Sequence, residues 1–294
     1  MKTTDISPSQ YHSDLLLNRK DIFAEDSYLS KSIVFSLYQS SLYKWRWFPG
    51  SYKPGPAMIW GSLVDCLATA PEEYDNSFVI SEFDSFRTKA AREWKEEMAD
   101  AGKTVITKEL LKDAQFACDI LTNKHKYAAS LIEKSRSQVV LIDKIQHPSV
   151  SRPVNVKGLV DFVPEGEDFL IDLKTTSDFT PGGFEKAIAK FGYHVQAAHY
   201  LGMWNALHPD DQRHRFQIIW QSSSRPYEVA VTELPESDIA DGADLFNHLL
   251  GKILRAAEKD YWPMRYPKPV LLSRATFGAF ADGVEIDGLT PCPE

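Results

Sequence analysis

The chain has 294 residues, 43% hydrophobic and 25% charged, which is a globular composition with enough length to bury a core. Its net charge of −8 excludes a uniformly basic surface, so a nucleic-acid partner would need a local basic face or the inside of a ring. Three unpaired-looking cysteines exclude a disulfide framework or cysteine metal site, and no signal-like or membrane-length apolar run occurs, so we expect a soluble, cytoplasmic protein with no membrane partner.

The first part of the chain is predicted to be mostly helical. Apolar residues spaced three and four apart, with Ser30 and Thr107 as N-caps, indicate amphipathic or buried helices. The predicted helices cover residues 30–45, 53–71, 85–102 and 107–134.

The periodicity then changes to that of strands, rich in β-branched and aromatic residues. The predicted strands are 137–146, 153–163, 168–176, 214–223 and 227–234, with helices over 182–207 and 236–259. We therefore predict a single α/β unit over 1–294. It comprises a helical N-terminal region to about 135, an α/β core at about 136–260 and an irregular tail at about 261–294.

Two strands of this core each carry one isolated aspartate, in the stretch VKGLVDFVPEGEDFLIDLKTT (156–176). Alternation places Asp172 and Lys174 on one face with Leu170, and Asp161 on one face with Leu159 and Val163. If PEGED is a hairpin turn, the strands are antiparallel neighbours and both carboxylates reach one point.

Two carboxylates that meet at one point repel each other, and the arrangement is unfavourable unless a cation lies between them. Lys174 alone could neutralise one, and an Asp–Lys pair two residues apart is usually an ordinary surface ion pair. A divalent metal explains both, and carboxylate oxygens suit Mg²⁺ or Mn²⁺. The position of the acids in two apolar strands favours the metal interpretation, in which Lys174 orients or activates water.

The helix predicted downstream carries Gln196 and Tyr200, four residues apart on one face, where they could hold a water or a phosphate. The alternative is a helix that packs its aromatic face on the sheet and leaves Gln196 solvated. His194 and His199 lie five apart on different faces, which excludes a zinc site built from them.

Asp161, DLK at 172–174 and QAAHY at 196–200 resemble the motifs of the PD-(D/E)XK nuclease superfamily, in its RecB-like branch. The segments YLSKSIVFSLYQSSLYKW and GPAMIWGSLVDCLATAPEEYDNSFVI are similar to the RecE (exodeoxyribonuclease VIII) exonucleases of phages and prophages. The likeness runs from about residue 10 to 205. It implies an α/β fold with a restriction-endonuclease-like core, a central mixed β-sheet flanked by helices and a mostly helical N-terminal region.

The resemblance implies a Mg²⁺-dependent 5′→3′ exonuclease on linear double-stranded DNA that leaves 3′ single strands for recombination. It implies that Asp161 and Asp172 bind metal with Asp65 and the carbonyl of Leu173, and that Lys174, Gln196 and Tyr200 complete the catalytic set. It also implies that the partners are DNA ends, a homo-oligomeric ring of copies of the chain, and a single-strand annealing protein.

Two positions depart from the family pattern. Relatives usually have a histidine ligand where GSLVDCL has Asp65, and often an acidic residue where this chain has Gln138. Aspartate is a good ligand for a hard cation, but it adds negative charge and has a shorter reach. A weakened or inactive nuclease that still binds DNA therefore remains an alternative to an active enzyme.

Contacts to DNA are assigned by composition and position. LYKWRWF (42–48) interleaves Lys44 and Arg46 with Trp45, Trp47 and Phe48, which could form a stacking wedge or equally a helix end whose aromatics are core. Lys186 and Lys190, on the helix after the Asp172 strand, are candidates for phosphate contacts. A third class, an enzyme for a small phosphate ester, would be active on nucleotides but not on duplex DNA.

Overall fold

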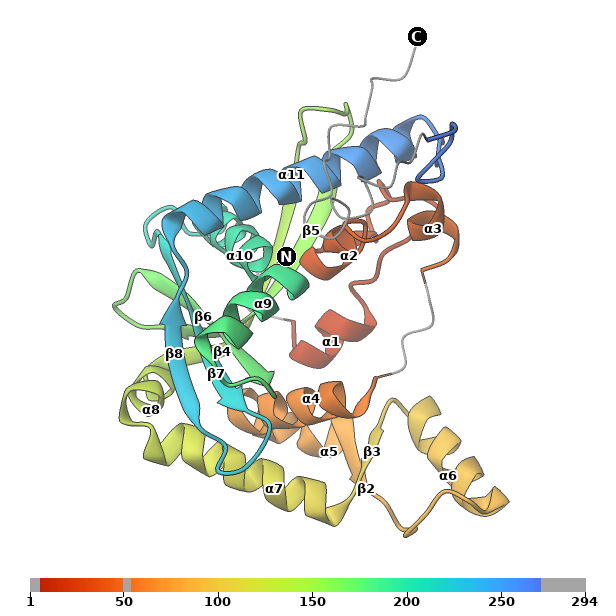
Figure 1. Cartoon of the computed structure of the whole chain (residues 1–294). Coiled ribbons are helices and arrows are strands. Elements are labelled where there is room, and N and C mark those ends of the chain that lie inside the picture. The colour runs from red at the N-terminus through yellow and green to blue at the C-terminus, as the bar shows by residue number, and fades with distance from the viewer. Residues whose placement is uncertain (1–5, 50–53, 271–294) are drawn as a thin grey trace.

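The computed structural model of the chain describes residues 6–49 and 54–270. Within these ranges six strands form a mixed sheet in the order β1-β5-β6-β7-β8, with β4 paired to β5 outside this path. The strands are β1 (Tyr28–Ser30), β4 (Ser135–Ile145), β5 (Val154–Pro164), β6 (Phe169–Thr176), β7 (Arg215–Ser222) and β8 (Val229–Glu233). Helices cover both faces of the sheet (Figure 1), which confirms the expected α/β fold with a central mixed sheet.

Strand β5 has a different neighbour at each end of one edge. Parallel β1 pairs with residues 155–157, whereas antiparallel β6 is joined to β5 by the single pair Phe162–Ile171. Strand β4 pairs along the other edge, and β6 continues into parallel β7 and then antiparallel β8. Strands β5 and β6 therefore diverge on the side of Asp161 and Asp172, and we call this opening the β5–β6 fork. The predicted turn joins them, with Gly166 in the left-handed region at φ +71°.

The helices before β4 follow the predicted positions but are shorter. They are α1 (Pro8–Ser13), α2 (Lys31–Phe35), α3 (Leu42–Trp47), α4 (Pro56–Thr69), α5 (Tyr74–Ser77), α6 (Lys89–Asp100), α7 (Lys108–Asp119) and α8 (Lys126–Glu133), with short turns η2 (Pro71–Glu73) and η3 (Ile120–Lys124). The single helices predicted over 30–45 and 107–134 are each two helices. Serine side chains explain the first break, since Ser36 bonds back to the Ile33 carbonyl and Ser41 caps α3. In the second, the π-helical turn η3 ends at His125, whose Nδ1 caps α8.

The helix predicted over 182–207 is also two helices, α9 (Pro181–Phe191) and α10 (Tyr193–Leu207). Gly192 separates them with φ +64°, and a Cβ there would lie 2.6 Å from the Phe35 ring. The last helix, α11 (Glu236–Glu258), begins and ends close to the predicted residues. Residues 261–270 contain no helix or strand, as expected for the start of the tail, and the rest of the predicted tail lies outside the described residues.

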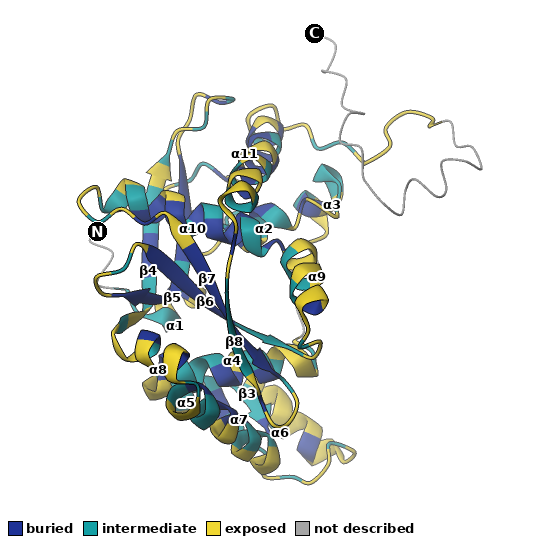
Figure 2. Cartoon of the chain, turned by 60° about the vertical axis from the view of Figure 1, so that its left-hand side comes forward, coloured by how far each residue is buried: buried dark blue, intermediate teal, exposed yellow. Residues whose placement is uncertain are grey.

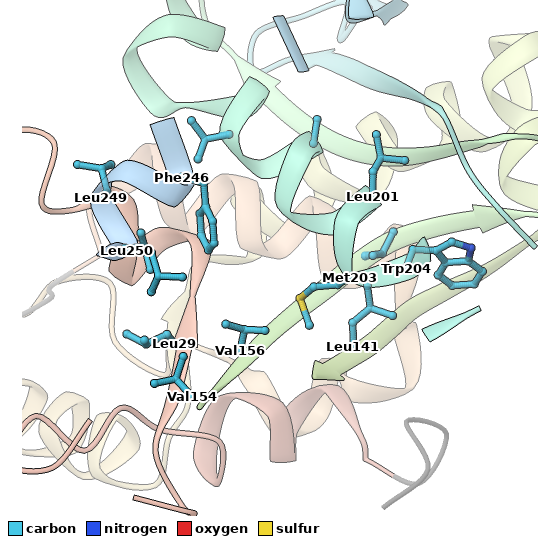
Figure 3. Packing of buried hydrophobic residues seen from close by; sticks show 14 of the residues in the cluster. Leu29, Leu141, Val154, Val156, Leu201, Met203, Trp204, Phe246, Leu249 and Leu250 are labelled. Carbon is cyan, nitrogen blue, oxygen red and sulfur yellow. The ribbon is translucent and has the colours of Figure 1, made fainter. Parts of the chain in front are cut away.

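Two large hydrophobic clusters fill the space on opposite faces of the sheet. One lies between the sheet and α10, α11 and α2, and includes Trp204, Phe246 and Val156 (Figure 3). The other lies between the sheet and α4, α7 and α8, and includes Leu63, Leu121 and Ile171. The outer helices have exposed faces, whereas α10 is buried on most sides (Figure 2). Because so little of α10 meets water, its sequence lacks a polar stripe.

Three strands were missed because three residues are too short to show alternation. Strand β1 joins the main sheet, so the N-terminal region and the core share one sheet. Strands β2 (Phe78–Ile80) and β3 (Thr104–Ile106) form a separate parallel pair beside α6. Among the described residues, no helix has the length and apolar character needed to cross a membrane.

Candidate active site

The β5–β6 fork brings Asp161 and Asp172 to the same place. Strands β5 and β6 separate after the Phe162–Ile171 pair, so the backbone N–H of Leu173 has no partner on the β5 backbone. It donates instead to the side chain of Asp161, at 2.7 Å from Oδ2. Asp172 is only 2% exposed, and both its oxygens have partners. Lys174 Nζ forms an ion pair with Oδ2, and the Gln196 amide donates to Oδ1 at 2.5 Å.

The predicted faces hold for β6 but not for β5. Leu170 packs in the α10-side cluster, while Ile171 and Leu173 pack in the α4-side cluster. On β5, Leu159 and Val163 belong to different clusters, so the expected single face through Asp161 is wrong. The cause lies on β4: Gln138, opposite Asp161, has φ +50° and is left out of the β4–β5 register, so regular alternation is interrupted there.

Asp65 lies on α4, which packs on the face of the sheet opposite to α10. Pro56 starts this helix and its apolar residues pack in the α4-side cluster, which directs Asp65 to the fork. Gln138 Nε2 donates to Thr69 Oγ1 at 2.7 Å and to Asp65 Oδ2 at 3.4 Å, and so joins β4 to α4. Asp65 Oδ1 is buried and has no hydrogen-bond partner in the described structure.

The three carboxylates affect one another electrostatically. Burial, opposed by Lys174 and reinforced by Asp172, raises the pKa of Asp65 to about 7. Burial, followed by the Asp172 and Asp65 carboxylates, raises the pKa of Asp161 well above its ordinary value. Burial alone would lower the pKa of Lys174, but Asp172 and Asp161 reverse this and raise it. One ammonium cannot balance three buried carboxylates, so the raised pKa values favour protonation of Asp161 and Asp65 as long as no cation offsets their charge.

Two residues of α10 that were predicted from the sequence, Gln196 and Tyr200, lie beside the fork. Gln196 holds Asp172, as described above, so the alternative of a merely solvated glutamine is excluded. The Tyr200 hydroxyl accepts the backbone N–H of Leu159, and its ring lies against Gly158, where a Cβ would be 3.1 Å away. His199 faces away from the fork, donates from Nε2 to the Lys157 carbonyl at 3.1 Å and stacks on Phe246. Among the described residues no zinc site involves it.

Two residues beside the site were not singled out from the sequence. Lys31 starts α2, donates to the carbonyl of Phe191 at 2.6 Å, and has its pKa lowered to about 7 by burial and by Lys174, against the effect of Asp172. Tyr193 lies 5.1 Å from Lys174 Nζ, measured to its ring centroid. The serine–lysine–serine start of the α2 segment could have indicated Lys31, whereas no pattern in the sequence distinguishes Tyr193.

A cavity of about 240 Å³ adjoins the fork at Tyr200. Lys31, Lys157 and His12 line it together with Ser30 and Ser32, and none of the described carboxylates contributes to its lining. Burial lowers the pKa of Lys157 to about 8, and its Nζ donates to the Tyr11 carbonyl at 2.8 Å. The acidic groups of the fork and the basic groups of the cavity therefore lie side by side.

The donors of the fork fit a divalent cation by their chemistry. Three carboxylates, an unpartnered buried oxygen on Asp65 and raised carboxyl pKa values are what a cation would relieve. In the described residues, however, no three His, Cys, Asp or Glu side chains already stand where they could hold one metal ion. In the same arrangement Lys174 and Gln196 contact both oxygens of Asp172. The predicted ligand Leu173 is close to the site, and its N–H is the group bonded to Asp161.

The residues predicted to bind DNA lie on two helices, α9 and α3. Lys186 and Lys190 are exposed on α9. Lys44 is exposed on α3, and Arg46 stacks on Trp47 with its Cζ 4.4 Å from the ring centroid. Trp45 is 3% exposed and donates its indole N–H to the Ile33 carbonyl, so it is part of the core. The other two rings of the predicted wedge, Trp47 and Phe48, are exposed.

Comparison with known proteins gives one matching family and several matching solved structures. Residues 41–268 match a family described as a PDDEXK-like domain of unknown function (DUF3799). A putative exonuclease from Eubacterium rectale has a similar structure, with TM-score 0.59 and 13% identity over 96% of this chain and 100% of that chain.

More distant structures belong to other exonucleases. They include an alkaline exonuclease from Laribacter hongkongensis (TM-score 0.34, 10% identity, 86% of this chain and 95% of that one). They also include a phage-related exonuclease from Haemophilus somnus 129PT (TM-score 0.33, 11% identity, 79% and 96%). No curated protein sequence matches the chain.

Proposed function

Because the chain belongs to the family of PDDEXK-like domains of unknown function, we propose that it is a metal-dependent DNA exonuclease. One observation carries the proposal: Asp161, Asp172 and Lys174 converge at the β5–β6 fork, and Asp65 reaches it from α4 with one oxygen that has no partner among the described residues. The similar fold of a protein described as a putative exonuclease supports the same reaction class.

The finer proposal follows the RecE-like resemblance. The substrate would be a linear double-stranded DNA end, degraded 5′→3′ to leave a 3′ single strand for recombination. A ring of copies of this chain and a single-strand annealing protein would be the partners, and the cytoplasm the location. The cationic cavity beside the carboxylates supports a polyanionic substrate, since Lys31 and Lys157 could accept a phosphate of the strand being degraded.

The proposed cofactor is Mg²⁺, with Mn²⁺ as a substitute, held by Asp65, Asp161, Asp172 and the carbonyl of Leu173. When bound, it would polarise a phosphate oxygen and make a coordinated water a better nucleophile. The protein's own groups would orient the reactants: the Lys174 ammonium can donate to the attacking water or to a non-bridging phosphate oxygen, and Gln196 keeps Asp172 in place. The water oxygen would bond to phosphorus and release its proton to solvent, while the P–O bond to the leaving sugar oxygen breaks and that oxygen takes up a proton from solvent.

A second candidate function rests on the contacts of Asp172. Because both its oxygens are already paired, the fork could be kept as a structural ion-pair site in a protein that binds duplex DNA without cutting it. Such a protein would bind DNA equally well with Mg²⁺ and with EDTA.

The deciding experiment is digestion of a linear duplex labelled at either the 5′ or the 3′ end, with Mg²⁺ or Mn²⁺, beside a closed circular duplex. We expect loss of the 5′ label first, survival of the circle, and no reaction with EDTA or with the Asp172→Asn variant. Binding without cleavage by the wild-type protein would support the second candidate. Cleavage that Asp172→Asn retains would show that the fork is not the active site.

A further inference from the structure

A second surface has aromatic and basic side chains but is not part of the fork. It consists of α3 with the two residues after it (42–49) and the segment 261–268, which we together call the α3 surface. The backbone N–H of Tyr43 donates to the Pro263 carbonyl at 3.0 Å, and Arg265 donates to the Ser40 carbonyl at 3.1 Å. Residues more than 200 positions apart are thus joined into one patch.

The α3 surface has an inner layer that is packed and an outer layer that is exposed. Trp45 stacks on Trp262 with ring centroids 5.9 Å apart, and these rings form the floor. Above the floor, the Arg46 guanidinium lies between Trp47 and Trp262, 4.4 and 5.4 Å from their centroids. The outer apolar side chains are Trp47, Phe48, Tyr261, Met264 and Tyr266, which are 51% to 62% exposed.

The charge of this surface is opposite to that of the whole chain. The stretches LYKWRWFP and YWPMRYPK contain four basic residues and no acidic one, in a protein of net charge −8. The nearest acid along the chain, Asp260, accepts the Trp262 indole N–H at 3.0 Å. Within residues 6–49 and 54–270, no ion pair involves these four cations. Exposed rings next to such cations are the arrangement used to bind bases and phosphates of an unpaired strand. A duplex would cover its bases and leave the rings without partners.

We infer that the α3 surface binds single-stranded DNA, with bases stacked on Trp47, Phe48 and Tyr266 and phosphates paired to Lys44, Arg46 and Arg265. The inference rests on the proposed function only in taking DNA as the nucleic acid. It differs from the stacking wedge predicted from the sequence in two ways. Trp45 is the floor and not a contact, and the segment after α11 supplies half of the surface.

The test is fluorescence anisotropy of a labelled oligothymidylate with the full-length protein in EDTA, which prevents cleavage. We expect the Trp47→Ala and Phe48→Ala variants each to bind about tenfold more weakly, and Trp47→Tyr to restore most of the affinity. Exchanging the exposed cations, Lys44→Gln with Arg265→Gln, should lower the slope of log affinity against log salt by about 1.4. Tyr127→Ala on α8, where the ring is 50% exposed, is the matched control and should bind like wild type.

Each outcome decides the inference. Unchanged binding by Trp47→Ala and Phe48→Ala, failure of Trp47→Tyr to restore affinity, or a duplex that competes better than the single strand overturns it. Thermal unfolding midpoints equal to that of wild type show that a loss of binding is not a loss of fold. If the wild type cuts duplex ends but does not bind the oligothymidylate, this inference falls and the proposed function stands. If the wild type binds the oligothymidylate but never cuts duplex ends, the proposed function is wrong and this inference stands.

Discussion

The two sides of the candidate site are held in different ways. On the sheet side, Asp161 accepts a backbone N–H and Asp172 is paired to both Lys174 and Gln196. On the α4 side, Asp65 has one oxygen within reach of Gln138 and another with no partner in the described structure. Strand β6 lies between the two hydrophobic clusters, with Leu170 in the one that contains α10 and Ile171 in the one that contains α4.

This difference assigns different tasks to the two sides. A carboxylate whose oxygens are fixed by hydrogen bonds has a defined position before any ligand arrives, which favours precise orientation of reacting groups. A buried carboxylate with an unpartnered oxygen is costly and gains most when a cation is supplied. We therefore expect the sheet side to control the rate and the α4 side to control the affinity for metal.

The Asp172→Asn variant gives the strongest test of whether the sheet side controls the rate. It removes the charge that Lys174 and the metal would share, so nuclease activity should fall by about 10³-fold or more in the end-labelled duplex assay. Asp168→Asn, four residues earlier on the same stretch, is the matched control. Its side chain is 50% exposed and pairs with Arg215, so its loss should leave the rate within about twofold of wild type. Similar rates for the two variants would contradict the proposed site.

A second prediction concerns how the free energy of unfolding depends on pH, through His199 on α10. Burial, partly offset by the bond to the Lys157 carbonyl, lowers the pKa of His199 to about 4, below its unfolded value near 6.5. The unfolded chain therefore binds the proton more readily than the folded protein. Stability is retained above pH 6.5 and lost as the pH falls towards 4, by up to about 3 kcal/mol. Urea unfolding at a series of pH values should show a smaller loss for His199→Gln; an equal loss in both proteins would exclude His199 as the cause.

The third prediction tests the α4 side. Asp65→Asn removes a charge but keeps the shape of the side chain, so we expect the Mg²⁺ concentration for half-maximal activity to rise about 10- to 100-fold, with a smaller change in the rate at saturating metal. Asp65→His should retain more affinity, because a neutral imidazole is also a metal ligand. Loss of the saturated rate without a change in metal requirement would show that Asp65 acts in the same way as Asp172.

The smallest expected effect compares two glycines near α10. Gly158→Ala places a Cβ 3.1 Å from the Tyr200 ring, so the ring must shift and stability should fall by about 1 kcal/mol with a modest loss of activity. Gly202→Ala, on α10 itself, has no neighbouring atom within 4 Å and should raise stability by about 0.5–1 kcal/mol through helix propensity. Chemical denaturation measures both. Opposite signs support the close packing of Tyr200 on β5, and equal signs would contradict it.

Local patterns predicted the elements well where one physical signal dominated. The strands β5 and β6 and the turn between them follow from apolar runs around a Gly-containing turn, and the shared face of Asp172 and Lys174 follows from strand alternation. The helix breaks were missed because each depends on a specific side-chain cap or a left-handed glycine, which periodicity does not detect.

By itself, the sequence determined that two isolated aspartates and a lysine lie on neighbouring strands, and that Gln196 and Tyr200 share a helical face, because these facts depend on spacing within single elements. Only the tertiary structure decided the rest. It brought Asp65 to the fork from another cluster, set Gln138 in a left-handed conformation opposite Asp161, placed Lys31 and Lys157 around one cavity, and buried Trp45 while exposing Trp47. These positions depend on which elements pack together, and contacts between residues far apart in the chain leave no periodic signal.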